Sequence, residues 1–272
     1  MRTLAFPIAA LALPCALLAQ WPDHRDAAAP RLPDGKVNLD APAPRASDGH
    51  PDLSGVWQFR GNRGRNSKEP PTPDTGGPPE ATFRNVAAGF KDGLPLRPAA
   101  ATLLKQRMAQ NSKDNPDAHC LPLGLMQLHL HPQPRKIIQT PAELVILYEA
   151  QSGIRQVFTD GRPLPENNPD SWWYGYSVGK WDGDTLVVET TGFRDDVWLD
   201  INGSPLTHTG KMTERFRRIN YGHMEIQVTI EDPSVYTRPW TVKVDHYLMP
   251  DTQLIEFICN ENERSDAHLV GK

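Results

Sequence analysis

Residues 224–231 read Met224-Glu225-Ile226-Gln227-Val228-Thr229-Ile230-Glu231, an unbroken alternation of apolar and polar side chains. Successive side chains of a β-strand point to opposite faces, so this stretch predicts a strand whose apolar face is buried. Similar segments, each followed by a turn signal such as Asp182-Gly183, recur from about residue 136 to residue 262. We expect strands near 135–140, 144–150, 154–160, 172–181, 185–191, 211–219, 224–231, 240–248 and 253–260.

This regular spacing predicts a mainly β fold, an antiparallel up-and-down meander closed as a lipocalin-like barrel. Closure is favoured because it removes the exposed edges of the sheet. A β-sandwich is the alternative arrangement. The barrel domain is expected to occupy residues 116–272.

The region before the barrel, residues 20–115, is rich in proline and glycine and predicts an irregular surface wrap. Two regular elements are expected within it. An apolar island at 53–59 predicts a short isolated strand. Pro98, followed by an alanine- and leucine-rich run, predicts one short helix over 98–111, because proline is favoured in the first turn of a helix.

The first 19 residues have the features of a secretory signal peptide. Arg2 supplies the positive charge, and the apolar run from Leu4 to Leu18 is too short to cross a bilayer. We therefore expect a periplasmic or extracellular protein. Removal of the leader leaves Cys120 and Cys259, which we expect to pair in an oxidising compartment, with two free thiols as the alternative.

Composition argues against several classes of partner. The 272-residue chain has 33 acidic and 29 basic side chains and a formal net charge of −4, so it has no basic excess with which to bind nucleic acid or anionic membranes. No later stretch reaches the length of a membrane span. No phosphate loop or dinucleotide glycine pattern occurs, and we expect no cofactor.

His129-Leu130-His131 places two imidazoles on one face if the segment is extended, as in some metal sites. No glutamate follows at the spacing that such sites use. We therefore interpret the pair as surface or turn residues and expect no metal.

The alternation in the strands brings several ionisable groups into the predicted interior. In 211–219 the buried face contains Glu214 and Arg218 together with Met212 and Phe216. Applied to 240–248 and 144–149, the same rule adds His246 and Tyr148, respectively. Ionisable groups in an apolar interior are paired, hydrogen-bonded or functional, so these four are candidate site residues. A structural Glu214–Arg218 ion pair and a hydrogen-bonded core histidine are the alternatives.

The densest aromatic cluster of the chain lies near 172–181. Exposed aromatic rings stack on sugars and flat organic molecules, so these residues are candidate ligand contacts at the barrel mouth. Packing in the core is the alternative. The five residues are Trp172, Trp173, Tyr174, Tyr176 and Trp181.

Two resemblances bear on these predictions. Gly55-x-Trp57, after Asp52-Leu53-Ser54, resembles the opening signature of lipocalins, whose tryptophan packs beneath a basic residue from the end of the barrel. This likeness implies a similar role for Arg264 and is one of fold only. The longer stretches 155–162, 175–193 and 213–218 look like a widespread family of secreted bacterial proteins of unassigned function, which implies export and no particular activity.

Three functions are compatible with these features. The first is an exported barrel that binds a small organic or carbohydrate ligand in a partly polar interior. The second is a cofactor-independent lyase, isomerase or hydrolase, with Glu214 or His246 transferring the proton, Tyr148 as a second acid and Arg218 stabilising negative charge. The third is an envelope protein whose proline-rich region contacts a partner.

Overall fold

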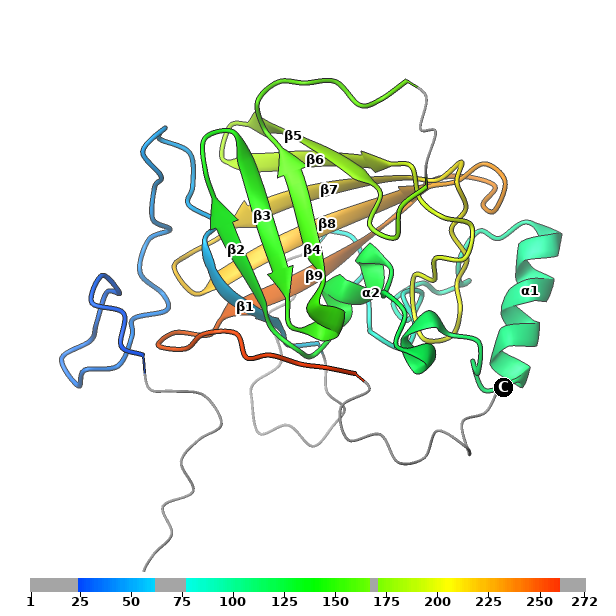
Figure 1. Ribbon diagram of the computed structural model, residues 1–272, viewed down its shortest axis with the longest axis horizontal. Helices are drawn as coiled ribbons and strands as arrows, with labels where there is room; N and C mark the ends of the chain where they lie inside the picture. The colour runs from blue at the N-terminus through cyan, green and yellow to red at the C-terminus, as the bar shows by residue number, and fades with distance from the viewer. Residues whose placement is uncertain (1–23, 62–76, 167–170, 260–272) are drawn as a thin grey trace, which may run out of the picture.

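The computed structural model describes residues 24–61, 77–166 and 171–259. Nine strands close a barrel around a buried core (Figure 1). The strands are β1 (Gly55–Phe59), β2 (Arg135–Gln139), β3 (Glu143–Tyr148), β4 (Ile154–Phe158), β5 (Tyr176–Asp182), β6 (Thr185–Thr191), β7 (Lys211–Arg218), β8 (His223–Glu231) and β9 (Trp240–Leu248). The helices are α1 (Pro98–Ala109), α2 (Leu125–Leu130) and the 3-10 turns η1 (Pro116–His119) and η2 (Ala150–Ser152).

The strand order follows the chain, and β1 closes the barrel by pairing with both β2 and β9. The predicted mainly β, closed-barrel fold is therefore confirmed. One pairing departs from an up-and-down meander, because β4 and β5 are parallel, with Val157 opposite Ser177. The connection over residues 159–175 is long enough to return the chain to the end of the barrel at which β4 began.

Two of the strand predictions need correction. The stretch at 53–59 was expected to be an isolated strand, whereas β1 is a barrel strand with neighbours on both sides. The prediction for 253–260 was wrong, because residues 252–258 have no strand structure. This segment runs along the outside of the barrel (Figure 1) and ends at the disulfide Cys120–Cys259, which confirms the predicted pairing.

The alternation of side chains inside the barrel agrees with the prediction from sequence. Met224, Ile226, Val228 and Ile230 of β8 are fully buried. The inward face of β7 contains Glu214, and that of β9 contains His246, both with no exposed surface. Tight turns fix this register; Gly183, between β5 and β6, has φ +58°, a conformation that favours glycine.

Helix α2 fills part of the barrel interior, since all six of its residues are buried. It begins after Gly124, which lies against the loop that follows β6. A Cβ atom at Gly124 would be 2.5 Å from the carbonyl oxygen of Trp198, so only glycine permits this close approach. From this position the ring of His129 reaches the inward side chains of Glu214, Phe216 and His246.

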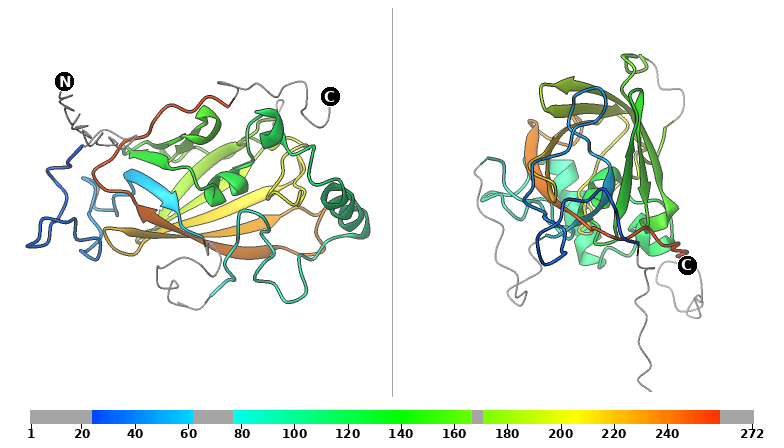
Figure 2. Two further views of the ribbon diagram at one scale, coloured as in Figure 1. Left: turned by 90° about the horizontal axis from the view of Figure 1, so that it is seen from below. Right: turned by 90° about the vertical axis from the view of Figure 1, so that its left-hand side faces the viewer.

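Residues 24–50 wrap one end of the barrel, on the left in Figure 1 and toward the viewer in the right panel of Figure 2. Arg45 forms an ion pair with Asp184 in the β5–β6 turn, and the ring of His50 stacks on Trp181 with centroids 4.5 Å apart. These contacts hold the N-terminal wrap, residues 24–50, against the β5–β6 end of the barrel.

Helix α1 confirms the predicted helix and lies at the opposite end of the molecule (Figure 1). Its apolar residues do not form a buried face, because Leu103 and Met108 are 38% and 48% exposed. In the parts of the chain that the structure describes, no helix has the length and apolar character needed to cross a bilayer.

Candidate functional site

The carboxylate of Glu214, in the middle of β7, is the centre of a buried polar cluster. It accepts hydrogen bonds from both terminal nitrogens of Arg155, with Nη1 2.9 Å from Oε1. It also accepts one from Nε2 of His129, which lies 2.6 Å from Oε1. All three side chains are at most 1% exposed, so this is an ion pair enclosed by the barrel.

The guanidinium of Arg155 connects Glu214 to two hydroxyl groups. Arg155 lies on β4 and donates to the Oγ atom of Ser177 on β5 and to Oγ1 of Thr190 on β6. The two hydroxyls are also 2.9 Å from each other. A fork of this kind satisfies every terminal nitrogen of Arg155 and makes it a rigid support for the carboxylate.

His129 was expected at the surface or in a turn, and this prediction was wrong. The residue lies on α2, not on an extended segment, and α2 inserts it into the barrel with 1% of its surface exposed. Its Nδ1 faces Nη1 of Arg135 at 3.5 Å. Since the ionised carboxylate of Glu214 can only accept, the proton of the neutral ring is on Nε2, where it is donated to Glu214.

Arg135, the first residue of β2, is the second buried guanidinium of the cluster. Its contacts are weaker than those of Arg155: 3.5 Å to His129 and 3.4 Å to the carbonyl oxygen of His131. Its Nε has no hydrogen-bond partner among the described residues. Burial lowers the pKa of Arg135 to about 10.

Two of the predicted residues, Tyr148 and His246, join this cluster. Tyr148 is directly opposite Arg135 in the β2–β3 ladder, and its hydroxyl faces Arg155 without meeting a partner at hydrogen-bonding geometry. Nε2 of His246 donates to the carbonyl oxygen of His129 at 2.8 Å, which leaves Nδ1 as an acceptor with no partner in the described part of the chain.

The protonation states follow from burial and the two arginines. Burial alone would raise the pKa of Glu214, but its attraction and hydrogen bonds to Arg155 and its hydrogen bond to His129 lower that pKa to about 2. Burial lowers the pKa of both His129 and His246, so both rings are neutral at pH 7. Burial raises the pKa of Tyr148, which keeps its hydroxyl protonated. The cluster therefore contains two positive charges and one negative charge.

Arg218, the fourth predicted residue, does not join this cluster and is not the partner of Glu214. It is buried near the end of β7, where it donates to the carbonyl oxygens of Asp52 and Tyr221. Its guanidinium lies over the ring of Trp57, 4.9 Å from the centroid. Arg218 thus occupies the position that the lipocalin resemblance assigned to Arg264, a residue outside the described part of the chain.

The five aromatic residues do not form one binding surface. Only Tyr174 is placed beside the cluster, with its ring 6.2 Å from that of Tyr148. Trp181 lies under His50 of the N-terminal wrap. The other three are Trp172, which is 38% exposed, Tyr176, which packs beside Phe158, and Trp173, which lies under Arg194.

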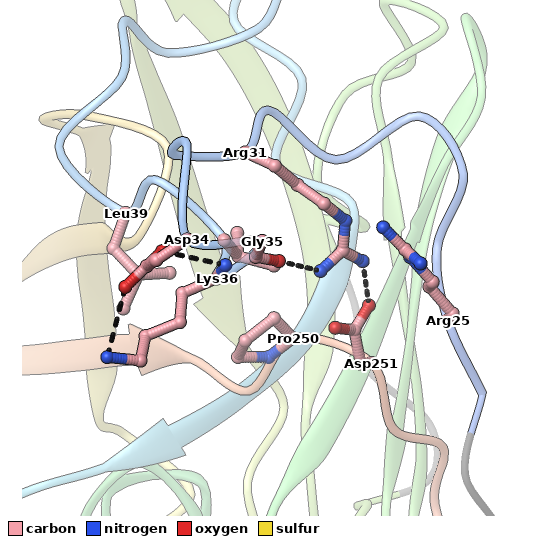
Figure 3. Close-up of a pocket in the computed structure, with 9 residues that line it drawn as sticks. Arg25, Arg31, Asp34, Gly35, Lys36, Leu39, Pro250 and Asp251 are labelled. Atoms are coloured by element: carbon pink, nitrogen blue, oxygen red, sulfur yellow. Dashed lines mark hydrogen bonds and ion pairs between the residues drawn. The ribbon is translucent and has the colours of Figure 1, made fainter.

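Two surface pockets lie apart from the cluster. One, of about 400 Å³, lies beside α1 and is lined in part by Trp173, Trp198 and His119. The other, of about 610 Å³, lies between the N-terminal wrap and the segment after β9 (Figure 3). Four of its five charged side chains form two ion pairs, since Arg31 is 2.7 Å from Asp251 and Lys36 is 3.1 Å from Asp34; the fifth is Arg25.

Three residues of the cluster were missed by the sequence interpretation. Arg135 and Arg155 share inward faces with Ile137 and Val157, so strand alternation could have identified them. On β4 the signal was obscured because Ile154, an apolar residue, is 62% exposed on the outer face. For His129 no local pattern indicated a short buried helix.

Comparisons with known proteins add no relative: no family model, curated protein or solved structure matches this chain significantly. The resemblance to a secreted bacterial family therefore stays a prediction.

Proposed function

We propose that this protein is an exported barrel that binds a small organic ligand in its partly polar interior. The observation that carries the proposal is that two of the buried polar atoms with no hydrogen-bond partner among the described residues, the Tyr148 hydroxyl and His246 Nδ1, belong to the cluster around the ion pair of Glu214 and Arg155. Buried polar groups are normally hydrogen-bonded, and groups left unpaired in a native protein are typical of binding and catalytic sites.

Export is supported by two features at different places in the chain. The N-terminal 19 residues have the pattern of a signal peptide, although they lie outside the described residues. The Cys120–Cys259 bond is of a kind that persists in oxidising compartments.

The proposal is tested by native mass spectrometry of the protein purified from a cell that exports it. We expect a species heavier than the mature, disulfide-bonded chain that loses a fixed small mass on denaturation. A His246→Phe variant, which removes the unpartnered Nδ1, should retain less of this mass. The matched control is His24→Gln on the exposed N-terminal segment. A wild-type protein that carries nothing and takes up nothing from a concentrated extract of small molecules contradicts the proposal.

A second candidate function is acid/base catalysis in the same interior, favoured by the states of Tyr148 and His246. The tyrosine hydroxyl is a proton donor and the neutral histidine ring a proton acceptor, although burial moves the pKa of each away from neutrality and so makes each a weak catalyst at pH 7. Glu214 is a poor base, because its lowered pKa and its two partners hold it ionised. In this function Glu214 orients His129 and Arg155, and Arg135 takes the charge-stabilising role expected of Arg218.

The two functions differ in what happens to the retained molecule. If the protein is an enzyme, the wild-type protein should convert that molecule, and Tyr148→Phe, at concentrations that saturate the variant, should not convert it. If the protein is only a binding protein, the molecule should be recovered unchanged from wild type and variant.

A further inference from the structure

Arg135 is a buried cation to which the described residues supply no acidic partner. Its side chain is among the largest fully buried ones of the protein, with 1% exposed. Its two terminal nitrogens make long contacts of 3.4 and 3.5 Å to neutral acceptors, and Nε makes none. These distances lie beyond the usual range for hydrogen bonds from nitrogen.

Two other buried arginines, Arg155 and Arg218, have hydrogen-bond acceptors for their guanidinium groups and serve as a comparison. Arg155, equally buried, has the Glu214 carboxylate and two hydroxyls. Arg218, also buried, donates to several main-chain carbonyls that close one end of the barrel. Among the described residues, Arg135 is the one of these three arginines with neither a carboxylate nor a short hydrogen bond.

The net charge of the cluster indicates which kind of ligand group would suit Arg135. With both histidines neutral, Arg135 and Arg155 contribute two positive charges and Glu214 one negative charge. An unpaired charge inside a protein is strongly unfavourable, and a single negative charge beside Arg135 would balance this one.

A second buried donor, the hydroxyl of Tyr148, belongs to the residue beside Arg135. Tyr148 is its direct neighbour across the β2–β3 ladder, and the guanidinium lies 5.8 Å from the centre of the tyrosine ring. Neither the Nε–H of Arg135 nor the O–H of Tyr148 has a hydrogen-bond partner among the described residues. A guanidinium and a phenol can both donate hydrogen bonds to a carboxylate, and the negative charge of the carboxylate strengthens these bonds.

We propose that the ligand is a small organic acid and that Arg135, assisted by the Tyr148 hydroxyl, binds its carboxylate. This inference rests on the proposed binding function and specifies its ligand class. His246 Nδ1, the remaining unpartnered acceptor of these three residues, suits a hydroxyl or amine donor on the same molecule.

The test uses the mature, disulfide-bonded protein and three carboxylates, acetate, lactate and benzoate, each beside its neutral amide. Thermal unfolding and calorimetry should show that at least one carboxylate stabilises wild type while its amide does not. Chloride and sulfate are the controls for binding of any anion, whatever its chemistry. Arg135→Met should weaken carboxylate binding at least tenfold and leave the melting temperature of the ligand-free protein unchanged or higher, because the variant removes an unbalanced charge.

Two further variants separate binding from folding. Arg135→Lys keeps the charge and should retain part of the affinity, whereas Arg218→Met, at a buried arginine outside the cluster, should leave the affinity per folded molecule unchanged. Carboxylate affinity that survives Arg135→Met overturns the inference, as does an equal response to the amides or to the inorganic anions. A neutral molecule retained by wild type overturns the ligand class alone, whereas a protein that retains nothing and responds to no probe overturns the proposed function with it.

Discussion

Nε2 of His129 lies 2.6 Å from Oε1 of Glu214, and both side chains are almost completely excluded from solvent. The histidine reaches this position from a six-residue helix that enters the barrel, and the glutamate from the middle of a strand. The contact therefore fixes α2 against the barrel wall. It also uses the one carboxylate of the cluster for internal support, so Arg135 receives no carboxylate from the described residues.

Replacing Glu214 by Gln should destabilise the protein strongly. The variant preserves the shape of the side chain but removes its charge, so Arg155 becomes a second buried cation without a carboxylate beside it. Breaking a buried ion pair in this way costs about 3 to 5 kcal/mol. Urea unfolding measures the loss. The matched control is Glu189→Gln at the half-exposed pair of Glu189 on β6 and Lys211 on β7, which should cost less than about 1 kcal/mol.

A double variant checks that the loss comes from the pair. Glu214→Leu with Arg155→Met removes both charges and should be more stable than either single variant, because no unpaired charge remains. Equal stability of the single and double variants would mean that the two residues are not coupled, contrary to the geometry.

Stability should decrease as the pH falls below about 6.5. Unfolded histidines take up a proton near that pH, whereas burial lowers the pKa of His246 well below it in the folded protein. Between the two pKa values the unfolded state binds more protons, so its free energy falls relative to the folded state as the pH decreases. Each such histidine contributes up to about 1.4 kcal/mol per pH unit.

The same variants that test ligand binding test this linkage. His246→Phe should reduce the slope of unfolding free energy against pH between about pH 6.5 and 5, while Arg218→Met, which removes no group that titrates in this range, should not change it. Glu214 adds a second decrease from its unfolded pKa near 4.5 down to its folded pKa of about 2. An unchanged slope in His246→Phe contradicts the assigned neutral state.

Much of this architecture could be predicted because strand alternation is a local property. The inward positions of Glu214, His246 and Tyr148 follow from counting residues along β7, β9 and β3. Their partners could not be derived in the same way. Arg155 reaches Glu214 across the interior from β4, 59 residues away in the chain, and only the closure of the barrel brings them together.

The parallel pairing of β4 and β5 and the position of α2 were unpredictable for a related reason. Both depend on where long connections return the chain, which no periodicity encodes. The short helix also has a pattern, Leu125-Met126-Gln127-Leu128-His129-Leu130, that is apolar on most sides and therefore does not distinguish a helix from a buried strand.

Removing the Cys120–Cys259 disulfide should destabilise the protein without changing its fold. The bond joins residues 139 apart and fastens the segment after β9 to the turn before α2. For a loop of this length the chain-entropy model gives roughly 4 to 5 kcal/mol as an upper value, and measured losses for such bonds are about 2 to 5 kcal/mol. We expect Cys120→Ser with Cys259→Ser to lower the unfolding free energy by a similar amount. Dithiothreitol should destabilise wild type but not this variant; equal sensitivity of the two would show that the bond is not the cause.

Arg218 should matter for stability and not for ligand binding. Its donors are used by main-chain carbonyls, including those of Asp52 and Tyr221, and its flat guanidinium covers Trp57. Lysine keeps the charge but cannot reproduce this fork, so Arg218→Lys should leave buried carbonyls unsatisfied and lower the unfolding free energy by about 1 to 3 kcal/mol. Urea unfolding, followed by tryptophan fluorescence, measures this loss, and calorimetry with the retained ligand measures affinity per folded molecule. If Arg218 instead stabilised negative charge on a ligand, Arg218→Lys would preserve stability and change affinity. The hydrogen bonds of Arg218 to the main chain lead us to expect the reverse.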